Sequence, residues 1–167
     1  MDQAIKIAGT GHRPDKLGGY SDVVTNLLFE LIQEAVIELN PQTVISGMAL
    51  GFDQVLAEVS LSLDIPFIAA IPFIGQEKQW PKPSQAHYHA LLKHASDVVT
   101  VSSGGFSHSA MQIRNQYMVD RCDVVLALWN GSPGGTANCI RYAKNIHKPI
   151  VNLWFKWQPS GLQFDKV

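Results

Sequence analysis

The sequence of 167 residues contains no long apolar run, no excess of positive charge and only two cysteines. No stretch approaches the roughly 20 apolar residues that a membrane-spanning helix needs. Residues 1–3 do not form a basic region before an apolar run, so we expect no signal peptide, a cytoplasmic location and no membrane partner. The net charge of −1 provides no overall basic field. Nucleic-acid binding is therefore not expected, because it would need a local basic patch.

The few cysteines and histidines do not form a convincing metal site. Cys122 and Cys139 fall in stretches that we expect to be helical or buried, so buried thiols are expected rather than a disulfide. His87 and His89 would not share a helix face, and neither they nor His94 have a cysteine or carboxylate at ligand spacing. We interpret these histidines as surface residues and expect no metal.

Two common catalytic signatures are also missing. No Gly-x-x-x-x-Gly-Lys-Ser/Thr sequence occurs, which excludes a Walker P-loop. Ser46 and Ser132 lack the Gly-x-Ser-x-Gly elbow, so a serine hydrolase triad has no support. The residues by themselves assign no catalytic group.

Short apolar runs alternate regularly with amphipathic segments. The clearest helix begins at Ser21 or Asp22 and continues to Leu39, with apolar pairs every four residues. Other helices are expected at 52–63, 85–94, 108–121 and 136–146, and strands at 4–8, 43–46, 65–71, 97–101, 123–129 and 149–154. Continuous apolar strands between helices indicate a parallel sheet that is covered on both faces. The predicted fold is α/β: one Rossmann-like, doubly wound, mainly parallel sheet in a single domain over residues 1–167.

Segments outside this alternation are expected to be irregular. The Pro and Gly content predicts a loop over residues 12–20. Residues 72–86 are long for a connection in a compact domain, which is compatible with a lid or a ligand-facing loop. Trp80 in this segment and the nearby Tyr88 could stack on a base or could simply pack.

The C-terminal tail, residues 155–167, carries Trp157 and Phe164. These aromatic residues could pack on the body of the protein or on another subunit. Apolar residues of the first helix could also serve an interface between copies. We expect a homo-oligomer, a dimer or larger.

Three glycine-rich loops follow expected strands, and ligands of doubly wound folds bind beyond the carboxyl ends of the strands. The first loop, residues 9–13, has a Gly-x-Gly that is too short for a dinucleotide fingerprint, so a tight turn and a ligand loop both remain open. Arg13 could pair with a phosphate or lie on the surface. His12 is expected to be a hydrogen-bonding loop residue rather than a base.

The other two loops open directly into helices, whose N-termini attract anions. In residues 46–53, small side chains permit close approach of a ligand, and Asp53 could accept ribose hydroxyls or cap the helix. In residues 131–136, three glycines exceed what a plain turn needs, and Thr136 adds a hydroxyl. This third loop favours phosphate binding.

The helix expected at 108–121 adds Arg114, Asn115 and Met118, which lie within about one turn of each other. They could face the ligand, or form a solvated polar face with the methionine in the core. The candidate ligand- and phosphate-binding residues are therefore Gly9, Thr10, Gly11, His12, Arg13, Ser46, Gly47, Met48, Ala49, Gly51, Asp53, Arg114, Asn115, Met118, Gly131, Gly134, Gly135 and Thr136.

These same motifs resemble those of a known superfamily. Residues 46–53, Ser-Gly-Met-Ala-Leu-Gly-Phe-Asp, are similar to the Ser-Gly-x-Ala-x-Gly-Ile-Asp motif of the DprA DNA-processing proteins. From Ile7 to about Pro149 the sequence resembles the YpsA-like branch of the SLOG superfamily. The motifs that carry this resemblance lie at residues 10–14, 72–73, 80, 114–120 and 129–136. The resemblance implies a Rossmann-like domain that binds nucleotides or nucleotide-derived signals at the glycine loops.

The LOG branch of that superfamily cleaves the N-glycosidic bond of nucleoside monophosphates. Residues 111–118 are similar to its Met-x-x-Arg-Lys-x-x-Met motif, so Arg114 would match its site arginine. LOG enzymes also have Pro-Gly-Gly-x-Gly-Thr followed shortly by glutamates, whereas here Gly135-Thr136 is followed by Ala-Asn-Cys at 137–139. The acid that would stabilise an oxocarbenium-like transition state is missing from this motif.

The favoured hypothesis is a binding module for a nucleotide-derived small molecule, such as NAD, ADP-ribose, a cyclic nucleotide or a mononucleotide. It would act as a sensor, carrier or sequestering protein and would require no other cofactor. One alternative is a LOG-like phosphoribohydrolase with Asp53 or Asp120 in the acid role. The other is DprA-like DNA binding, against which the near-neutral charge argues.

Overall fold

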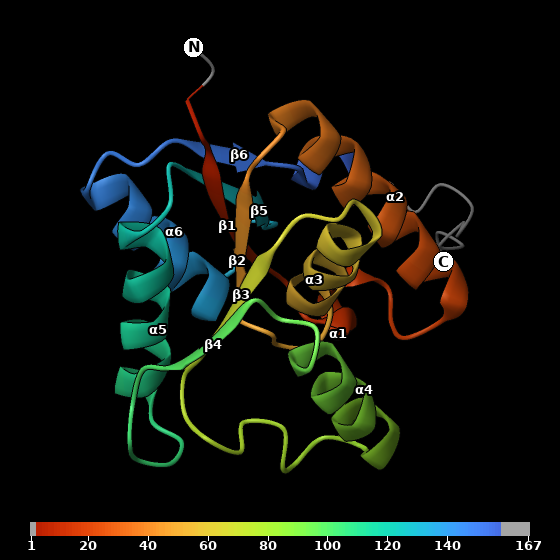
Figure 1. Ribbon diagram of the computed structural model, residues 1–167, viewed down its shortest axis with the longest axis vertical. Coiled ribbons are helices and arrows are strands. Elements are labelled where there is room, and N and C mark those ends of the chain that lie inside the picture. Colours follow the sequence, from red (N-terminus) through yellow and green to blue (C-terminus); the bar gives the residue numbers. More distant parts are fainter. Residues whose placement is uncertain (1–2, 158–167) are drawn as a thin grey trace.

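The computed structural model describes residues 3–157, so Phe164 of the tail lies outside the described residues. The chain forms a six-stranded sheet with the order β4-β3-β2-β1-β5-β6, in which all neighbouring strands are parallel (Figure 1). The strands are β1 Lys6–Gly11, β2 Thr43–Ser46, β3 Phe67–Ile71, β4 Asp97–Thr100, β5 Val124–Leu128 and β6 Ile150–Asn152. The predicted Rossmann-like α/β class is confirmed.

Helices cover both faces of the sheet. They are α1 Pro14–Leu17, α2 Asp22–Leu39, α3 Phe52–Ser62, α4 Lys82–Leu92, α5 His108–Asp120 and α6 Gly135–Asn145, with a 3-10 helix η1 at Trp154–Lys156. One side carries α2, α3 and α4, and the other carries α5 and α6 (Figure 1). Successive strand residues point to opposite faces, so Ile7 and Val44 join the core under α2 and α3, while Ala8 and Ile45 join the core under α5 and α6.

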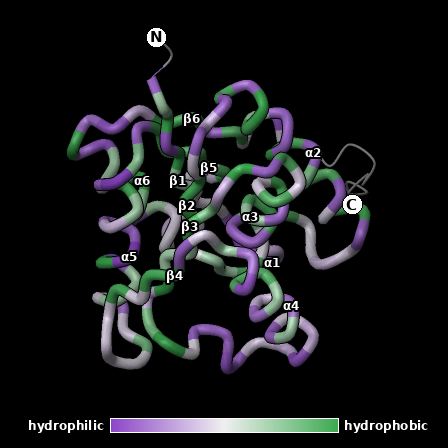
Figure 2. The backbone as a smooth tube through the Cα atoms, in the orientation of Figure 1, coloured by the Kyte–Doolittle hydropathy of each residue, from purple (hydrophilic) through white to green (hydrophobic). Residues whose placement is uncertain are grey.

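The long helix α2 illustrates how the pattern produces the fold. The Ser21 hydroxyl accepts a hydrogen bond from the backbone N–H of Val24 at 3.3 Å, which caps the first turn. The buried residues of the helix recur every three or four positions and are Val24, Leu28, Ile32, Ala35 and Val36. Hydrophilic and hydrophobic residues accordingly alternate along the helices in Figure 2. The predicted start and end of this helix are confirmed.

The strand order reverses at β1, which has β2 on one side and β5 on the other. The chain leaves β1 toward α2 on one face of the sheet and leaves β5 toward α6 on the opposite face (Figure 1). The two connections therefore diverge, and a crevice opens between them at the carboxyl ends of these strands. This is the position at which ligands bind in open α/β sheets.

Two glycines of the predicted first loop belong to a strand instead. The strand β1 covers Lys6–Gly11 rather than residues 4–8, and therefore includes Gly9 and Gly11. A Cβ atom on Gly9 would lie 2.2 Å from Leu56 Cδ2, and one on Gly11 would lie 2.3 Å from Phe52 Cγ. These glycines allow α3 to pack closely against β1, a long-range requirement that local spacing does not reveal.

The predicted loop over residues 12–20 contains the short helix α1. Pro14 occupies its first turn, and Gly18 ends it in the left-handed conformation with φ of 105°. In the tail, Trp157 is buried in the core with α2, so it packs on the body of the protein. None of the helices within residues 3–157 is both long enough and apolar enough to cross a membrane.

Candidate functional site

A cavity of about 500 Å³ lies at the carboxyl ends of β1 and β5, beside the first turn of α6. A volume of this size falls within the usual range for small-molecule sites. Of the residues selected from the sequence, those that line it are Thr10, Gly11, His12, Arg13, Ala49, Asp53, Arg114, Asn115, Met118, Gly134, Gly135 and Thr136. The end of β1, the loop after β5, one face of α5 and the start of α6 thus meet in a single hollow.

The first turn of α6 provides an open anion cradle on one wall of the cavity. Gly134 is the N-cap residue with φ of 140°, and among the described residues no side chain caps this helix end. A Cβ atom on Gly134 or Gly135 would meet no atom within 4 Å. The first N–H groups of a helix have no partner within the helix, and the helix dipole adds about half a positive charge. This wall can therefore bind a phosphate.

Arg114 of α5 forms the floor of the cavity and is only 5% exposed. Its Nη1 donates to the carbonyl oxygen of Gly47 at 2.8 Å, and its Nε donates to Asn115 Oδ1 at 3.2 Å. Burial lowers the pKa of Arg114, while the nearby Asp53 acts in the opposite direction. An arginine has five N–H donors, so further donors of this guanidinium remain for a ligand.

Asn115 connects this floor to the anion cradle. Its Nδ2 donates to the carbonyl oxygen of Gly135 at 3.3 Å, while its Oδ1 accepts from Arg114. The side chain is 5% exposed and cannot turn freely, since both of its ends are bonded. The guanidinium and the start of α6 are consequently held in a fixed relation.

Asp53, in the first turn of α3, is a buried carboxylate on the cavity wall. Its Oδ2 accepts from the backbone N–H of Ala49 at 3.2 Å, whereas Oδ1 has no hydrogen-bond partner within residues 3–157. Burial raises the pKa of Asp53 to about 6, against the opposing effects of Arg114, the Ala49 N–H and Arg13. Perturbed carboxylates of this kind cluster at functional sites, which makes Asp53 a candidate site residue.

The pKa of Asp53 predicts how stability depends on pH. In the ligand-free protein the folded state binds more protons than the unfolded state between pH 3.8 and about 6. The contribution of Asp53 to the free energy of unfolding therefore rises by about 1.4 kcal/mol as the pH falls from 7 to 5. Urea denaturation of the wild type and of Asp53→Asn at both pH values measures this effect. The difference in the free energy of unfolding between the two proteins should change by that amount from pH 7 to pH 5. An unchanged difference would refute the assignment.

His12 ties the first loop to the third. Its Nε2 lies 2.9 Å from both the backbone nitrogen and Oδ1 of Asn130, and its ring meets Trp154 edge-on at 5.8 Å. Burial lowers the pKa of His12 below 6.5, an effect opposed by the hydrogen bond to Asn130. The ring holds the two loops together through these contacts.

The cavity has more basic than acidic side chains. Lys16 Nζ donates to Ser132 Oγ at 2.8 Å and to the carbonyl oxygen of Pro133 at 3.4 Å. With Arg13 and Arg114 it gives three cationic groups on the cavity wall, against Asp15 and Asp53. This balance suits an anionic ligand.

Several selected residues support the cavity without lining it. The Ser46 hydroxyl donates to the backbone oxygen of Asp53 at 2.7 Å and accepts from the N–H of Met48. A Cβ atom on Gly47 would lie 2.5 Å from Arg114 Nη1, so glycine is required for the guanidinium to fit. Outside the lining are Gly9, Ser46, Gly47, Met48, Gly51 and Gly131.

Trp80 and Tyr88 lie away from the cavity. Tyr88 is 2% exposed, and its ring packs edge-on against Trp80 with centroids 5.3 Å apart. Neither ring lines the cavity, and the two rings pack α4 against the preceding segment. Base stacking by Trp80 and Tyr88 therefore stays a prediction that the geometry of this cavity does not support. Asp120 is likewise outside the lining and is exposed, with its Oδ1 accepting from the Tyr142 hydroxyl at 2.6 Å.

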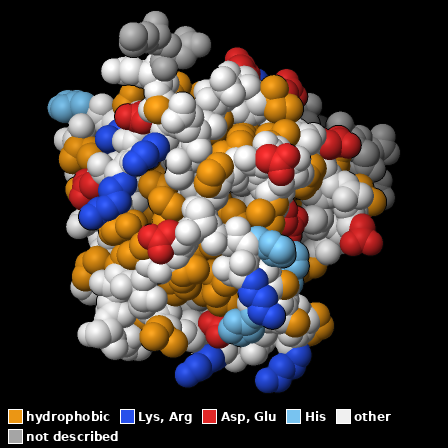
Figure 3. All heavy atoms as spheres, in the orientation of Figure 1, with side chains coloured by type: hydrophobic (Ala, Val, Ile, Leu, Met, Phe, Trp, Pro, Cys, Tyr) orange, Lys and Arg blue, Asp and Glu red, His pale blue; other side chains and the backbone are white. Residues whose placement is uncertain are grey.

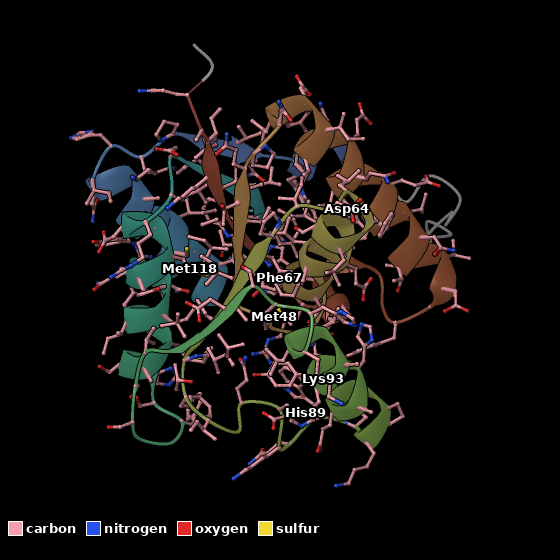
Figure 4. All side chains as sticks on the ribbon, in the orientation of Figure 1. Met48, Asp64, Phe67, His89, Lys93 and Met118 are labelled. Carbon is pink, nitrogen blue, oxygen red and sulfur yellow. The ribbon has the colours of Figure 1, made fainter. Side chains whose placement is uncertain are left out.

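The histidines of α4 take ordinary surface positions. His87 lies 2.5 Å from Glu58, and His89 lies 3.4 Å from Glu77. Figure 3 shows histidine side chains beside basic and acidic ones over α4, and Figure 4 places His89 on that helix, away from Met118 on α5. The two cysteines are free and buried, as predicted.

Other cavity residues were not selected from the sequence. They are Asp15, Lys16, Phe106, His108, Met111, Gln112, Ser132, Pro133 and Asn138. Met111 could have been predicted as a cavity residue, because it stands three residues before Arg114 and so shares its helix face. Lys16 could not have been predicted from the sequence, since its position depends on the short helix α1.

Together, the strand order and the cavity define a Rossmann-like α/β protein with a ligand-sized hollow at its switch point. Comparison with known proteins gives the family. The YpsA model, described as the YspA SLOG family, matches residues 7–149. The chain belongs to this family, as its motifs predict.

Relatives in sequence support the assignment. The SPbeta prophage-derived protein YoqJ of Bacillus subtilis is 32% identical, over 72% of this chain and 80% of YoqJ. A UPF0398 protein of Halalkalibacterium halodurans is 27% identical, over 81% of this chain and 78% of its own length.

Solved structures show the same fold at low sequence identity. DNA processing protein A (DprA) from Streptococcus pneumoniae has a TM-score of 0.64 and 18% identity over 89% of this chain, which spans half of that protein. The molybdenum cofactor carrier protein of Chlamydomonas reinhardtii has a TM-score of 0.56 and 14% identity, over 90% of this chain and 76% of its own. At these identities the likeness concerns the fold alone.

Proposed function

We propose that this protein binds a phosphorylated, nucleotide-derived small molecule in the cavity and acts as a sensor, carrier or sequestering protein. The observation that carries the proposal is that the uncapped start of α6 and the buried guanidinium of Arg114 face one hollow. Suitable ligands are NAD, ADP-ribose, a cyclic nucleotide or a nucleoside monophosphate.

The electrostatics of the cavity favour a phosphate near Gly134 and Gly135. Free N–H groups at a helix start bind anions directly, and a guanidinium adds charge-assisted hydrogen bonds that are stronger than neutral ones. Arg13 and Lys16 add two further positive charges on the cavity wall. A small-molecule carrier of this fold has a parallel in the molybdenum cofactor carrier proteins.

Gly135→Ala is the sharpest test of the phosphate cradle. The new methyl group would meet no protein atom within 4 Å, so the free energy of unfolding should stay within about 0.5 kcal/mol of the wild type. The methyl would occupy space that the phosphate needs, and we expect the dissociation constant to rise on the order of tenfold.

The measurement is isothermal titration with NAD, ADP-ribose, cyclic AMP, cyclic GMP and the four ribonucleoside 5′-monophosphates. At least one should bind to the wild type with a micromolar or tighter dissociation constant. Gly104→Ala is the matched control, because its methyl also meets no atom within 4 Å and Gly104 does not line the cavity. If the wild type binds none of these compounds measurably, the proposal is contradicted.

A second candidate is cleavage of a nucleotide N-glycosidic bond, which the buried carboxylate of Asp53 in the cavity favours. With its pKa raised to about 6, this group could stabilise positive charge that develops on the sugar. Incubation of the protein with the four ribonucleoside 5′-monophosphates, followed by chromatography, tests it. If no free base is released, the binding function remains without catalysis.

A further inference from the structure

The two oxygens of the Asp53 carboxylate have different surroundings. Oδ2 is bonded to the N–H of Ala49 at 3.2 Å, and Oδ1 is buried without a partner among residues 3–157. Leaving a buried acceptor unsatisfied is costly, and more so for a charged group. An unsatisfied oxygen on a residue that lines a ligand-sized cavity points to a ligand that supplies the missing donor.

The neighbouring arginine does not supply that donor. Arg114 directs its Nη1 to the Gly47 carbonyl and its Nε to Asn115, and no Arg114 nitrogen lies within 4.0 Å of a carboxylate oxygen of Asp53. The guanidinium attracts the carboxylate through space but leaves Oδ1 free. The torsion of an aspartate carboxylate is soft, so a small turn about the Cβ–Cγ bond presents this oxygen to the cavity.

The part of the ligand at Asp53 must differ from the part at α6. An ionised carboxylate only accepts hydrogen bonds, and it repels a phosphate. We therefore place the phosphate at Gly135. Asn115 connects this position to Arg114, since it donates to the Gly135 carbonyl oxygen at 3.3 Å and accepts from Arg114 Nε at 3.2 Å. One molecule in the cavity can therefore place its phosphate at α6 and a hydroxyl group at Asp53.

We propose that Asp53 Oδ1 accepts a hydrogen bond from a ribose hydroxyl of the ligand, so that the cavity selects ribonucleotides over their deoxy counterparts. This inference rests on the proposed function and assigns the sugar subsite within it. Every ribonucleoside 5′-monophosphate carries 2′- and 3′-hydroxyl donors on the same sugar that bears the phosphate. Removing that hydroxyl leaves the carboxylate unsatisfied again, which is the basis of strong discrimination.

The test compares AMP, GMP, CMP and UMP with their 2′-deoxy and 3′-deoxy counterparts by isothermal titration. For the wild type we expect one of the two deoxy forms to bind at least tenfold more weakly than the ribonucleotide. In Asp53→Asn the ratio of the dissociation constants of the deoxy form and the ribonucleotide should fall below about threefold. The asparagine keeps an oxygen for the Ala49 N–H, so loss of selectivity would not reflect a displaced loop. Asp64→Asn, at an exposed carboxylate outside the cavity, should retain the full ratio of dissociation constants between ribonucleotide and deoxy form.

The outcomes separate this inference from the proposed function. Equal binding of ribonucleotides and both deoxy forms to the wild type would overturn the sugar subsite and leave the phosphate site standing. Retained discrimination in Asp53→Asn would also overturn it, by assigning selectivity to another residue. If none of the four monophosphates binds, the inference falls, and the titrations with NAD, ADP-ribose and cyclic nucleotides judge the proposed function on their own.

Discussion

Replacing Arg114 with alanine is expected to weaken ligand binding on the order of 100-fold. The same change should lower the free energy of unfolding by about 3 kcal/mol at pH 7.5. The first effect follows because the guanidinium forms the cationic floor of the cavity. The second follows because Asp53 is left as a buried carboxylate without Arg114, the positive charge that acts on it most strongly. Isothermal titration and urea denaturation measure the two effects separately.

A double variant distinguishes the two causes. In Asp53→Asn/Arg114→Ala the cavity wall no longer holds a buried carboxylate, so most of the lost stability should return while phosphate binding stays weak. Arg114→Lys keeps the charge but not the planar fork, and should bind at an intermediate level. If Arg114→Ala binds the ligand as tightly as the wild type, the guanidinium has no part in the site.

Gly11→Ala should lower the free energy of unfolding by about 3 kcal/mol. The new Cβ would lie 2.3 Å from Phe52 Cγ and 2.6 Å from Phe52 Cβ, far inside van der Waals contact. Phe52 is fully buried, and its N–H donates to the His12 carbonyl at 3.3 Å, so the start of α3 cannot easily retreat. Because Gly11 also lines the cavity, ligand affinity should fall with stability.

Thermal and urea denaturation check this prediction, with Gly104→Ala as the control in open space. The control should remain within about 0.5 kcal/mol of the wild type. A Gly11→Ala variant as stable as its control would mean that α3 does not pack against β1 as described.

Most of the architecture could be predicted from the sequence, because the local spacing of apolar residues determines where the strands and helices lie. The four-residue repeat of α2 and the apolar runs of β2 and β5 identify their elements within a residue or two. Once strands and helices alternate, a parallel sheet and right-handed crossovers follow. The glycine loops then fall at the carboxyl ends of the strands without further information.

Features that depend on long-range packing could not be predicted in this way. The Gly-x-Gly at residues 9–11 lies in β1, and the reason is the side chains of Phe52 and Leu56 more than 40 positions along the chain. Lys16 reaches the third loop only because α1 turns it toward Ser132. Trp80 and Tyr88 look available for stacking in the sequence, yet they meet each other.

The central claim is that the uncapped start of α6 and the guanidinium of Arg114 together bind one phosphorylated ligand. Amide chemical shifts of the ¹⁵N-labelled protein, recorded during titration with the tightest-binding nucleotide of the panel, test it most directly. The account predicts that the largest shifts occur at Gly134, Gly135 and Thr136, with smaller ones at Gly11 and Arg13. Shifts confined to other parts of the chain, with these amides unmoved, would contradict it.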